Sequence, residues 1–146
     1  FACLFIYEVL NHFIKKDPLY DHHQMITFFF LLCTLFLGVY FYPRLYTSAS
    51  FFLTTFLMSL QFFVFRFRWM GRFYAGYFVA LVPFLVMNGW LTGAFTEEPI
   101  VWYNDLENMG LRIFSIPAED SMYLLSYLFI ATIFYERTKL KSPAFR

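Results

Sequence analysis

The chain has 146 residues, of which 60% are hydrophobic, 25% are aromatic and only 14% are charged, with a net charge of +1. Soluble domains carry roughly 25% charged residues, so this composition excludes an ordinary soluble globular protein. It indicates an integral membrane protein with little soluble mass.

The hydrophobic residues are grouped in runs that predict transmembrane helices. Residues 1–14 are expected to be the end of a helix, followed by a short polar loop. Complete spans are then predicted at Gln24–Tyr42, Ser48–Phe65, Phe73–Leu91 and Pro117–Tyr135. Each is close to the ~20 residues that cross a bilayer. The predicted fold is an all-α polytopic transmembrane bundle of four complete helices plus the end of another.

Basic residues are concentrated in the loops on one side of this predicted bundle. Nine lie there: Lys15, Lys16, Arg66, Arg68, Arg72, Arg137, Lys139, Lys141 and Arg146. The other side has Arg44 and Arg112. The positive-inside tendency therefore predicts a cytoplasmic C-terminus and an outer position for the loop 92–116. The basic, aromatic stretch 66–72 is better explained by anchoring at the inner leaflet than by nucleic-acid binding.

The third span ends with a polar residue, and a long polar loop follows it. Asn88 lies within the last turns of the span and needs a hydrogen-bonding partner at that depth. Helix–helix packing and a role in a site are both open explanations for it. The loop 92–116 is too polar to cross the membrane, and its length favours a function. Arg112 is the basic residue closest to the following acidic pair and could bind one of its members.

The acidic pair Glu119 and Asp120 opens the last span. Pro117 is expected in the first helical turn, which places Glu119 at about the third helical position. A carboxylate there can cap free backbone N–H groups, which would be a purely structural role. Placing a charged side chain at the entrance of a membrane helix nevertheless costs free energy, so two adjacent acids favour a functional site.

Four sequence blocks in this order resemble the C-terminal half of the non-flavin, integral-membrane lycopene cyclases. They are Asn88-Gly89-Trp90-Leu91-Thr92-Gly93, Glu98-Pro99-Ile100-Val101-Trp102-Tyr103-Asn104, Asn108-x-Gly110-x-Arg112-Ile113 and Ile116-Pro117-x-Glu119-Asp120-x-x-Tyr123. The resemblance implies that residues 1–14 end a transmembrane helix of the preceding repeat. It further implies that residues 15–47 form a loop and a linker helix, and that residues 48–146 form a three-helix repeat. It also implies a partner, the N-terminal half with its own acidic motif, either fused or a separate subunit.

The resemblance implies carotenoid biosynthesis in a bacterial inner membrane, by conversion of the ψ-ends of lycopene into β-ionone rings without net redox change. The enzyme would be an intramolecular lyase or isomerase. An acid protonates the terminal double bond, the resulting tertiary cation closes the ring, and a base removes a proton. Burial and a neighbouring carboxylate both disfavour the charged form of such an acid, while a helix N-terminus favours it.

We assign Glu119 as the expected proton donor, with Asp120 orienting it or acting as the base. Supporting residues are expected to be Asn88, Trp102, Tyr103, Asn104, Asn108, Arg112 and Tyr123. The asparagines would supply hydrogen bonds and the aromatic rings would stabilise the cation, although anchoring at the interface is an equally good explanation for any single ring.

Other functions remain open at this point. A related carotenoid hydratase would pass through the same cation and admit water to it. A small three-helix-repeat transporter could use parallel repeats around a linker helix. The sequence has no glycine-rich nucleotide-binding loop and no cluster with metal-ligand spacing, so no cofactor and no metal are expected. The two cysteines, Cys3 and Cys33, both lie in apolar runs and do not indicate a disulfide framework.

Overall fold

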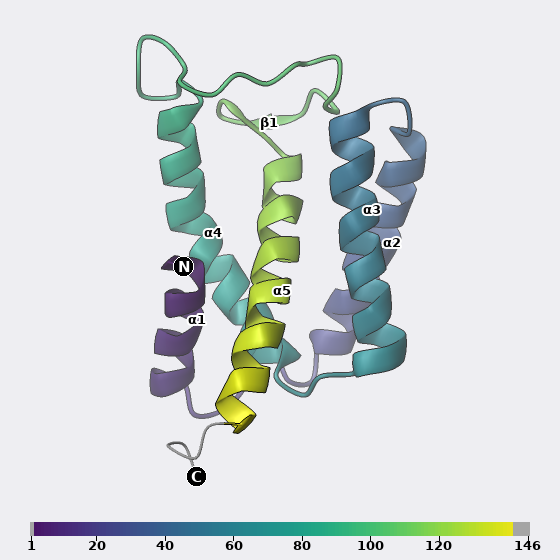
Figure 1. Cartoon of the computed structure of the whole chain (residues 1–146), viewed down its shortest axis with the longest axis vertical. Coiled ribbons are helices and arrows are strands. Elements are labelled where there is room, and N and C mark those ends of the chain that lie inside the picture. The colour runs from purple at the N-terminus through teal and green to yellow at the C-terminus, as the bar shows by residue number, and fades with distance from the viewer. Residues whose placement is uncertain (1, 142–146) are drawn as a thin grey trace.

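A computed structural model describes residues 2–141 as a bundle of helices that run along one common direction (Figure 1). The elements are α1 (Ala2–Phe13), α2 (His23–Tyr40), α3 (Leu45–Ser59), η1 (Leu60–Phe65), α4 (Met70–Leu91), β1 (Arg112–Ile113), β2 (Ile116–Pro117) and α5 (Glu119–Lys141). η1 is a π-helix that continues α3. The prediction of an all-α membrane bundle is confirmed.

The predicted spans correspond to α2, α3 with η1, α4 and α5. Within residues 2–141, the first three of these are long and apolar enough to cross a membrane. α5 is as long as they are, with 23 residues, but it falls outside that group. Its lower hydropathy follows from Glu119 and Asp120 at its start and from Glu136 and Arg137 near its end.

α5 occupies the middle of the bundle, between α4 with α1 on one side and α3 with α2 on the other (Figure 1). Hydroxyl groups join the helices across these contacts. Thr54 and Ser126 are 2.9 Å apart between α3 and α5, and Thr34 and Thr55 are 2.8 Å apart between α2 and α3. Such bonds satisfy polar groups where lipid offers no partner.

α1 approaches α4 closely because Gly76 has no side chain. A Cβ at this position would lie 3.2 Å from the ring and 3.5 Å from the Cα of Tyr7. Tyr7 is almost fully buried, and its hydroxyl donates to Glu136 of α5 over 2.8 Å. α1 is therefore fixed against both α4 and α5.

The loops gather at two ends of the bundle, as the alternation of spans predicts. The turn 41–44 and the long loop 92–116 lie at one end, and the loops 14–22 and 66–69 lie at the other (Figure 1). The start of α3 and the start of α5 consequently lie at the same end, beneath the loop 92–116.

Candidate active site

A short β-hairpin directly precedes the acidic pair and leads the chain into α5. β1 pairs antiparallel with β2, with Ile113 opposite Ile116. Phe114 makes the turn between them with a φ of 57°, in the left-handed region that non-glycine residues rarely adopt. Ile116 is fully buried. This arrangement corrects our expectation for Pro117, which lies in β2 and not in the first turn of α5.

Glu119 is the first residue of α5 and is fully buried. Its Oε1 accepts hydrogen bonds from the Thr47 hydroxyl, at 2.5 Å, and from the Met109 backbone N–H, at 2.6 Å. Both donors lie outside α5. Its Oε2 is buried and has no hydrogen-bonding partner in the described part of the chain. The side chain is therefore directed at α3 and the loop, and it does not cap its own helix.

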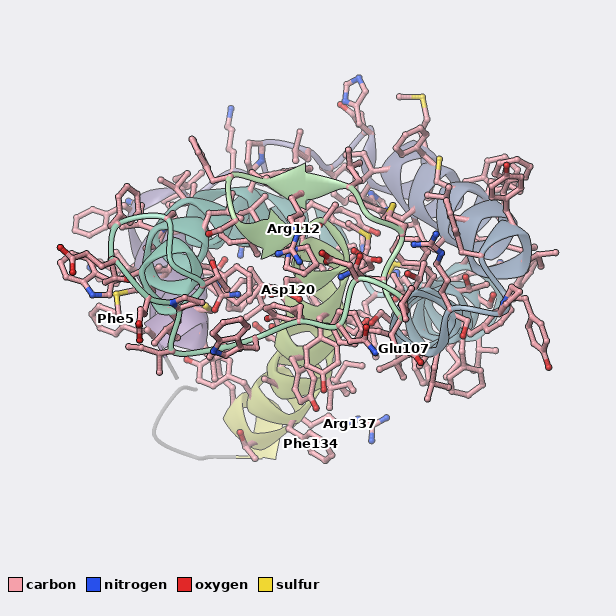
Figure 2. All side chains as sticks on the ribbon, turned by 90° about the horizontal axis from the view of Figure 1, so that it is seen from above. Phe5, Glu107, Arg112, Asp120, Phe134 and Arg137 are labelled. Atoms are coloured by element: carbon pink, nitrogen blue, oxygen red, sulfur yellow. The ribbon has the colours of Figure 1, made fainter. Side chains whose placement is uncertain are left out.

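Asp120, which is only 3% exposed, has a different environment. Its Oδ1 accepts a hydrogen bond from the Tyr46 hydroxyl at 2.5 Å. Its Oδ2 accepts from the Tyr103 hydroxyl at 2.7 Å and from the Asn88 amide at 3.0 Å. All three partners are donors, an arrangement that stabilises the ionised carboxylate. Seen from above, Asp120 lies near the centre of the bundle (Figure 2).

Tyr46 and Tyr103 also contact each other, with ring centroids 5.8 Å apart. Burial raises the pKa of the Tyr103 hydroxyl, and its hydrogen bond to Asp120 raises the pKa further. Tyr103 therefore remains a hydrogen-bond donor throughout the physiological pH range.

The loop 92–116 is held in place by the N-terminal end of α3. The Glu107 carbonyl accepts from the backbone N–H groups of Tyr46 and Thr47, at 3.0 and 3.3 Å, and the Glu107 carboxylate accepts from the Leu45 N–H at 3.1 Å. These bonds satisfy donors that a helix start leaves free. The Arg44 guanidinium adds a hydrogen bond to the Asn108 carbonyl. The loop is thus anchored beside the residues that reach the two acids.

The asparagines of the loop stabilise the loop itself. Asn108 is 1% exposed, and its side chain contacts the Asn104 carbonyl, the Asp105 carboxylate and the Gly110 N–H. The Asn104 side chain accepts from the Leu106 N–H at 3.1 Å. Neither asparagine reaches the acidic pair in this structure.

Arg112 pairs with Asp105 and not with either member of the acidic pair. This pairing lowers the pKa of the Asp105 carboxyl, chiefly through the hydrogen bond from the guanidinium. Arg112 also donates to the Ser115 carbonyl at 2.5 Å. Its observed contacts therefore join the loop to the hairpin, in place of the pairing that its sequence position suggested.

Two predicted aromatic residues lie apart from the carboxylates. Trp102 is 79% exposed. Tyr123 is 40% exposed and shares a hydrogen bond of 2.9 Å with the Tyr127 hydroxyl. Of the residues selected from the sequence, Asn88 and Tyr103 are the two that bind the acidic pair directly.

The sequence analysis missed three groups that contact the acids: the side chains of Tyr46 and Thr47, and the N–H of Met109. None of the three was among the residues selected from the sequence. A signal was present, because the predicted topology places the start of α3 at the same end as the acidic pair. Within residues 2–141, no three His, Cys, Asp or Glu side chains come close enough together to hold a metal ion.

The family model described as lycopene cyclase matches residues 43–138, which is more than half of the chain. The matched range runs from the start of α3 to the last turns of α5 and includes every residue found at the acidic pair. Comparisons with curated proteins and with solved structures found no match.

Proposed function

Because this chain belongs to the lycopene cyclase family of carotenoid biosynthesis, we propose that it converts ψ-ends of lycopene into β-ionone rings, with Glu119 as the proton donor and Asp120 as the base. The observation that carries the proposal is the contrast between two adjacent, buried carboxyl groups. Among the described residues, Oε2 of Glu119 is buried and has no hydrogen-bonding partner, whereas both oxygens of Asp120 accept hydrogen bonds. Pairs of acids in unlike environments can divide the roles of acid and base.

The reaction balances without an external reductant or oxidant. The proton on Oε2 of Glu119 is transferred to the terminal double bond and leaves a tertiary carbocation. The electron pair of the neighbouring double bond then forms the ring bond, and the Asp120 carboxylate removes a ring proton. Return of that proton to Glu119 completes the cycle, so the product is an isomer of the substrate.

Burial of the pair supports this chemistry in two ways. Oε2 of Glu119 has no hydrogen-bonding partner in the described part of the chain, so transfer of a proton from it to the substrate would break no hydrogen bond within the protein. Exclusion of water also protects the carbocation from hydration. The family match and this burial both favour cyclisation over the hydratase and transporter alternatives.

We further propose that α3 with η1, α4 and α5 form one three-helix repeat, that α2 is a linker helix, and that α1 ends the preceding repeat. An N-terminal half would then supply a second acidic motif. The arrangement is supported by the family match, which begins at the start of α3. The charge distribution supports a cytoplasmic C-terminus in an inner membrane.

The test is pigment analysis of lycopene-accumulating cells that express the complete protein with Glu119→Gln. Glutamine keeps the shape of the side chain but cannot donate a carboxyl proton, so γ- and β-carotene should disappear. Glu97→Gln, at an exposed position of the loop 92–116, should leave the pigments unchanged. Full cyclisation by a normally expressed Glu119→Gln protein would refute the assignment. A product heavier by one water would instead identify a hydratase.

A further inference from the structure

One oxygen of the proposed proton donor accepts two hydrogen bonds from distant parts of the chain. Oε1 of Glu119 accepts from the Thr47 hydroxyl of α3 at 2.5 Å and from the Met109 backbone N–H of the loop 92–116 at 2.6 Å. Oε2, which would carry the proton, is buried and has no partner among the described residues. The two oxygens of this carboxyl group therefore have separate environments, one for the proton and one for the donors.

The donors at Oε1 contact an atom on which negative charge develops during the proposed reaction. When Oε2 gives its proton to the terminal double bond, the electron pair of the O–H bond stays on the carboxyl group and is shared by both oxygens. Hydrogen bonds to an ionised acceptor are roughly twice as strong as those to a neutral one, so both bonds to Oε1 strengthen as the proton leaves. Donors that are already in position stabilise such charge without reorganisation during the reaction.

The Met109 N–H is oriented by a turn that the Asn108 side chain stabilises. Asn108 Oδ1 accepts from the Gly110 N–H at 2.8 Å, so Met109 is the central residue of an Asx-type turn. Gly110 has a φ of 79°, which glycine adopts at no steric cost. The Asn108 amide donates to the Asn104 carbonyl at 3.4 Å and to the Asp105 carboxylate at 3.2 Å. Asn108 thus uses both ends of its side chain to fix the turn, although it contacts neither acid.

Backbone hydrogen bonds also fix this turn relative to α3 and to the start of α5. The Glu107 carbonyl, two residues before Met109, accepts from the Thr47 N–H at 3.3 Å. The Leu111 carbonyl, two residues after Met109, accepts at 2.9 Å from the N–H of Ala118, the residue before α5. Both donors to Oε1 are therefore part of one connected arrangement, in which the turn is held from two sides.

We propose that the Met109 N–H and the Thr47 hydroxyl form a preorganised donor pair that stabilises the Glu119 anion as it forms, and that Asn108 is the positioning residue that holds the Met109 N–H in this pair. This inference rests on the proposed function and assigns the groups that promote its first step, the protonation of the substrate. Asn108 acts through the backbone of the next residue, so it requires no contact with the acids or with the carotenoid.

The direct test removes the Met109 N–H and leaves every side chain in place. The complete protein is made by cell-free translation into lipid nanodiscs, with the hydroxy-acid analogue of methionine at position 109, so that an ester replaces the amide. The kcat for cyclic product should fall about ten- to a hundred-fold, as expected for one hydrogen bond to a charged group. The KM for lycopene should stay within about two-fold, because the lost bond is to Glu119 and not to the substrate.

The matched control is an ester at Leu106 of the same loop. The Leu106 N–H donates within the loop and does not contact the acids. An ester also weakens the preceding carbonyl as an acceptor, and the carbonyls that precede these two positions, of Asp105 and Asn108, both accept from Arg44. The Leu106 ester should keep the parent kcat. The donor pair is refuted if the Met109 ester also keeps it, if the two esters lower kcat equally, or if only KM changes.

Asn108→Ala tests the positioning role. It should lower kcat about as much as the Met109 ester does, whereas Thr96→Ala, which removes a side-chain hydrogen bond elsewhere in the same loop, should not. Because Asn108 acts through an N–H that the ester has already removed, Asn108→Ala in the ester protein should cause little further loss. Losses that multiply in the combined protein would refute this role of Asn108.

The parent protein separates failure of this inference from failure of the proposed function. If the parent cyclises lycopene and the Met109 ester does so equally well, the donor pair is refuted and the proposed function stands. If the parent forms no cyclic product, the proposed function fails and this inference fails with it. The ester experiment does not depend on the folding of Asn108→Ala.

Discussion

Tyr46→Phe should slow cyclisation more than Tyr103→Phe does, because the two hydroxyls serve different oxygens of Asp120. Tyr46 is the donor to Oδ1, and no other donor to that oxygen is found in the described chain. Oδ2 would still accept from Asn88 after loss of the Tyr103 hydroxyl. Both substitutions keep the ring and remove one hydrogen bond. They differ mainly in whether the affected oxygen of Asp120 keeps another hydrogen-bond donor.

The magnitude follows from the charge on the acceptor. A hydrogen bond to a charged group contributes about 1.5–3 kcal/mol. Since roughly 1.4 kcal/mol corresponds to a factor of ten in rate, Tyr46→Phe should slow the reaction by about ten- to a hundred-fold. For Tyr103→Phe, the remaining bond from Asn88 should keep the loss below about ten-fold.

The assay is the initial rate of cyclic product formation in membranes that contain equal amounts of each protein. Tyr42→Phe is the control, since Tyr42 is 71% exposed and lies just before α3. A loss for Tyr46→Phe no larger than that for Tyr42→Phe would refute the reasoning. A larger loss for Tyr103→Phe than for Tyr46→Phe would refute the role assigned to the single donor at Oδ1.

Two further predictions concern the donor to the other acid and the support of the loop. Thr47→Val removes the hydroxyl donor to Glu119 and should lower the free energy of unfolding in detergent by about 1–3 kcal/mol. Thr47→Ser keeps the hydroxyl and should restore the stability. Equal stability of the two variants would contradict the contact. Arg112 lowers the pKa of the folded-state Asp105 carboxyl, so the stabilisation is present above the usual aspartate range and is lost as the pH falls through the lowered pKa. The hydrogen-exchange protection factors of residues 92–116, which compare each observed rate with the intrinsic rate at the same pH, should therefore fall in acid, and Arg112→Gln should remove that pH dependence. An unchanged dependence in the variant would exclude this ion pair as its cause.

The sequence predicted the helices well because membrane spans are determined by local composition. The predicted runs match the structure to within a few residues at most boundaries. The largest difference is at the end of α5, which continues to Lys141 and not only to Tyr135. At the start of α5, Pro117 was placed in the helix because proline suits both a first helical turn and an edge strand. The hairpin depends on a positive φ at Phe114, which no glycine signals in the sequence. The π-helix η1 likewise has no local pattern that separates it from α3.

The candidate site was predictable only in part, and the reason is its long-range contacts. Asn88 and Tyr103 lie in the blocks that identify the family and were selected for that reason. Tyr46 and Thr47 reach the acids only because α3 is rotated to present both hydroxyls towards α5. Helix rotation depends on packing across the whole bundle, and a single sequence does not specify it.

The contact between the starts of α3 and α5 has a consequence for biogenesis. Thr47 and Glu119 are separated by 72 positions in the chain. At about 5–20 residues per second, a ribosome needs roughly 4–14 s to make that interval. During this time α2 and α3 can already pair, while the hydroxyls of α3 still lack their carboxylate acceptors. The acidic pair, in turn, enters an almost complete bundle. Assembly of the site is therefore a late step.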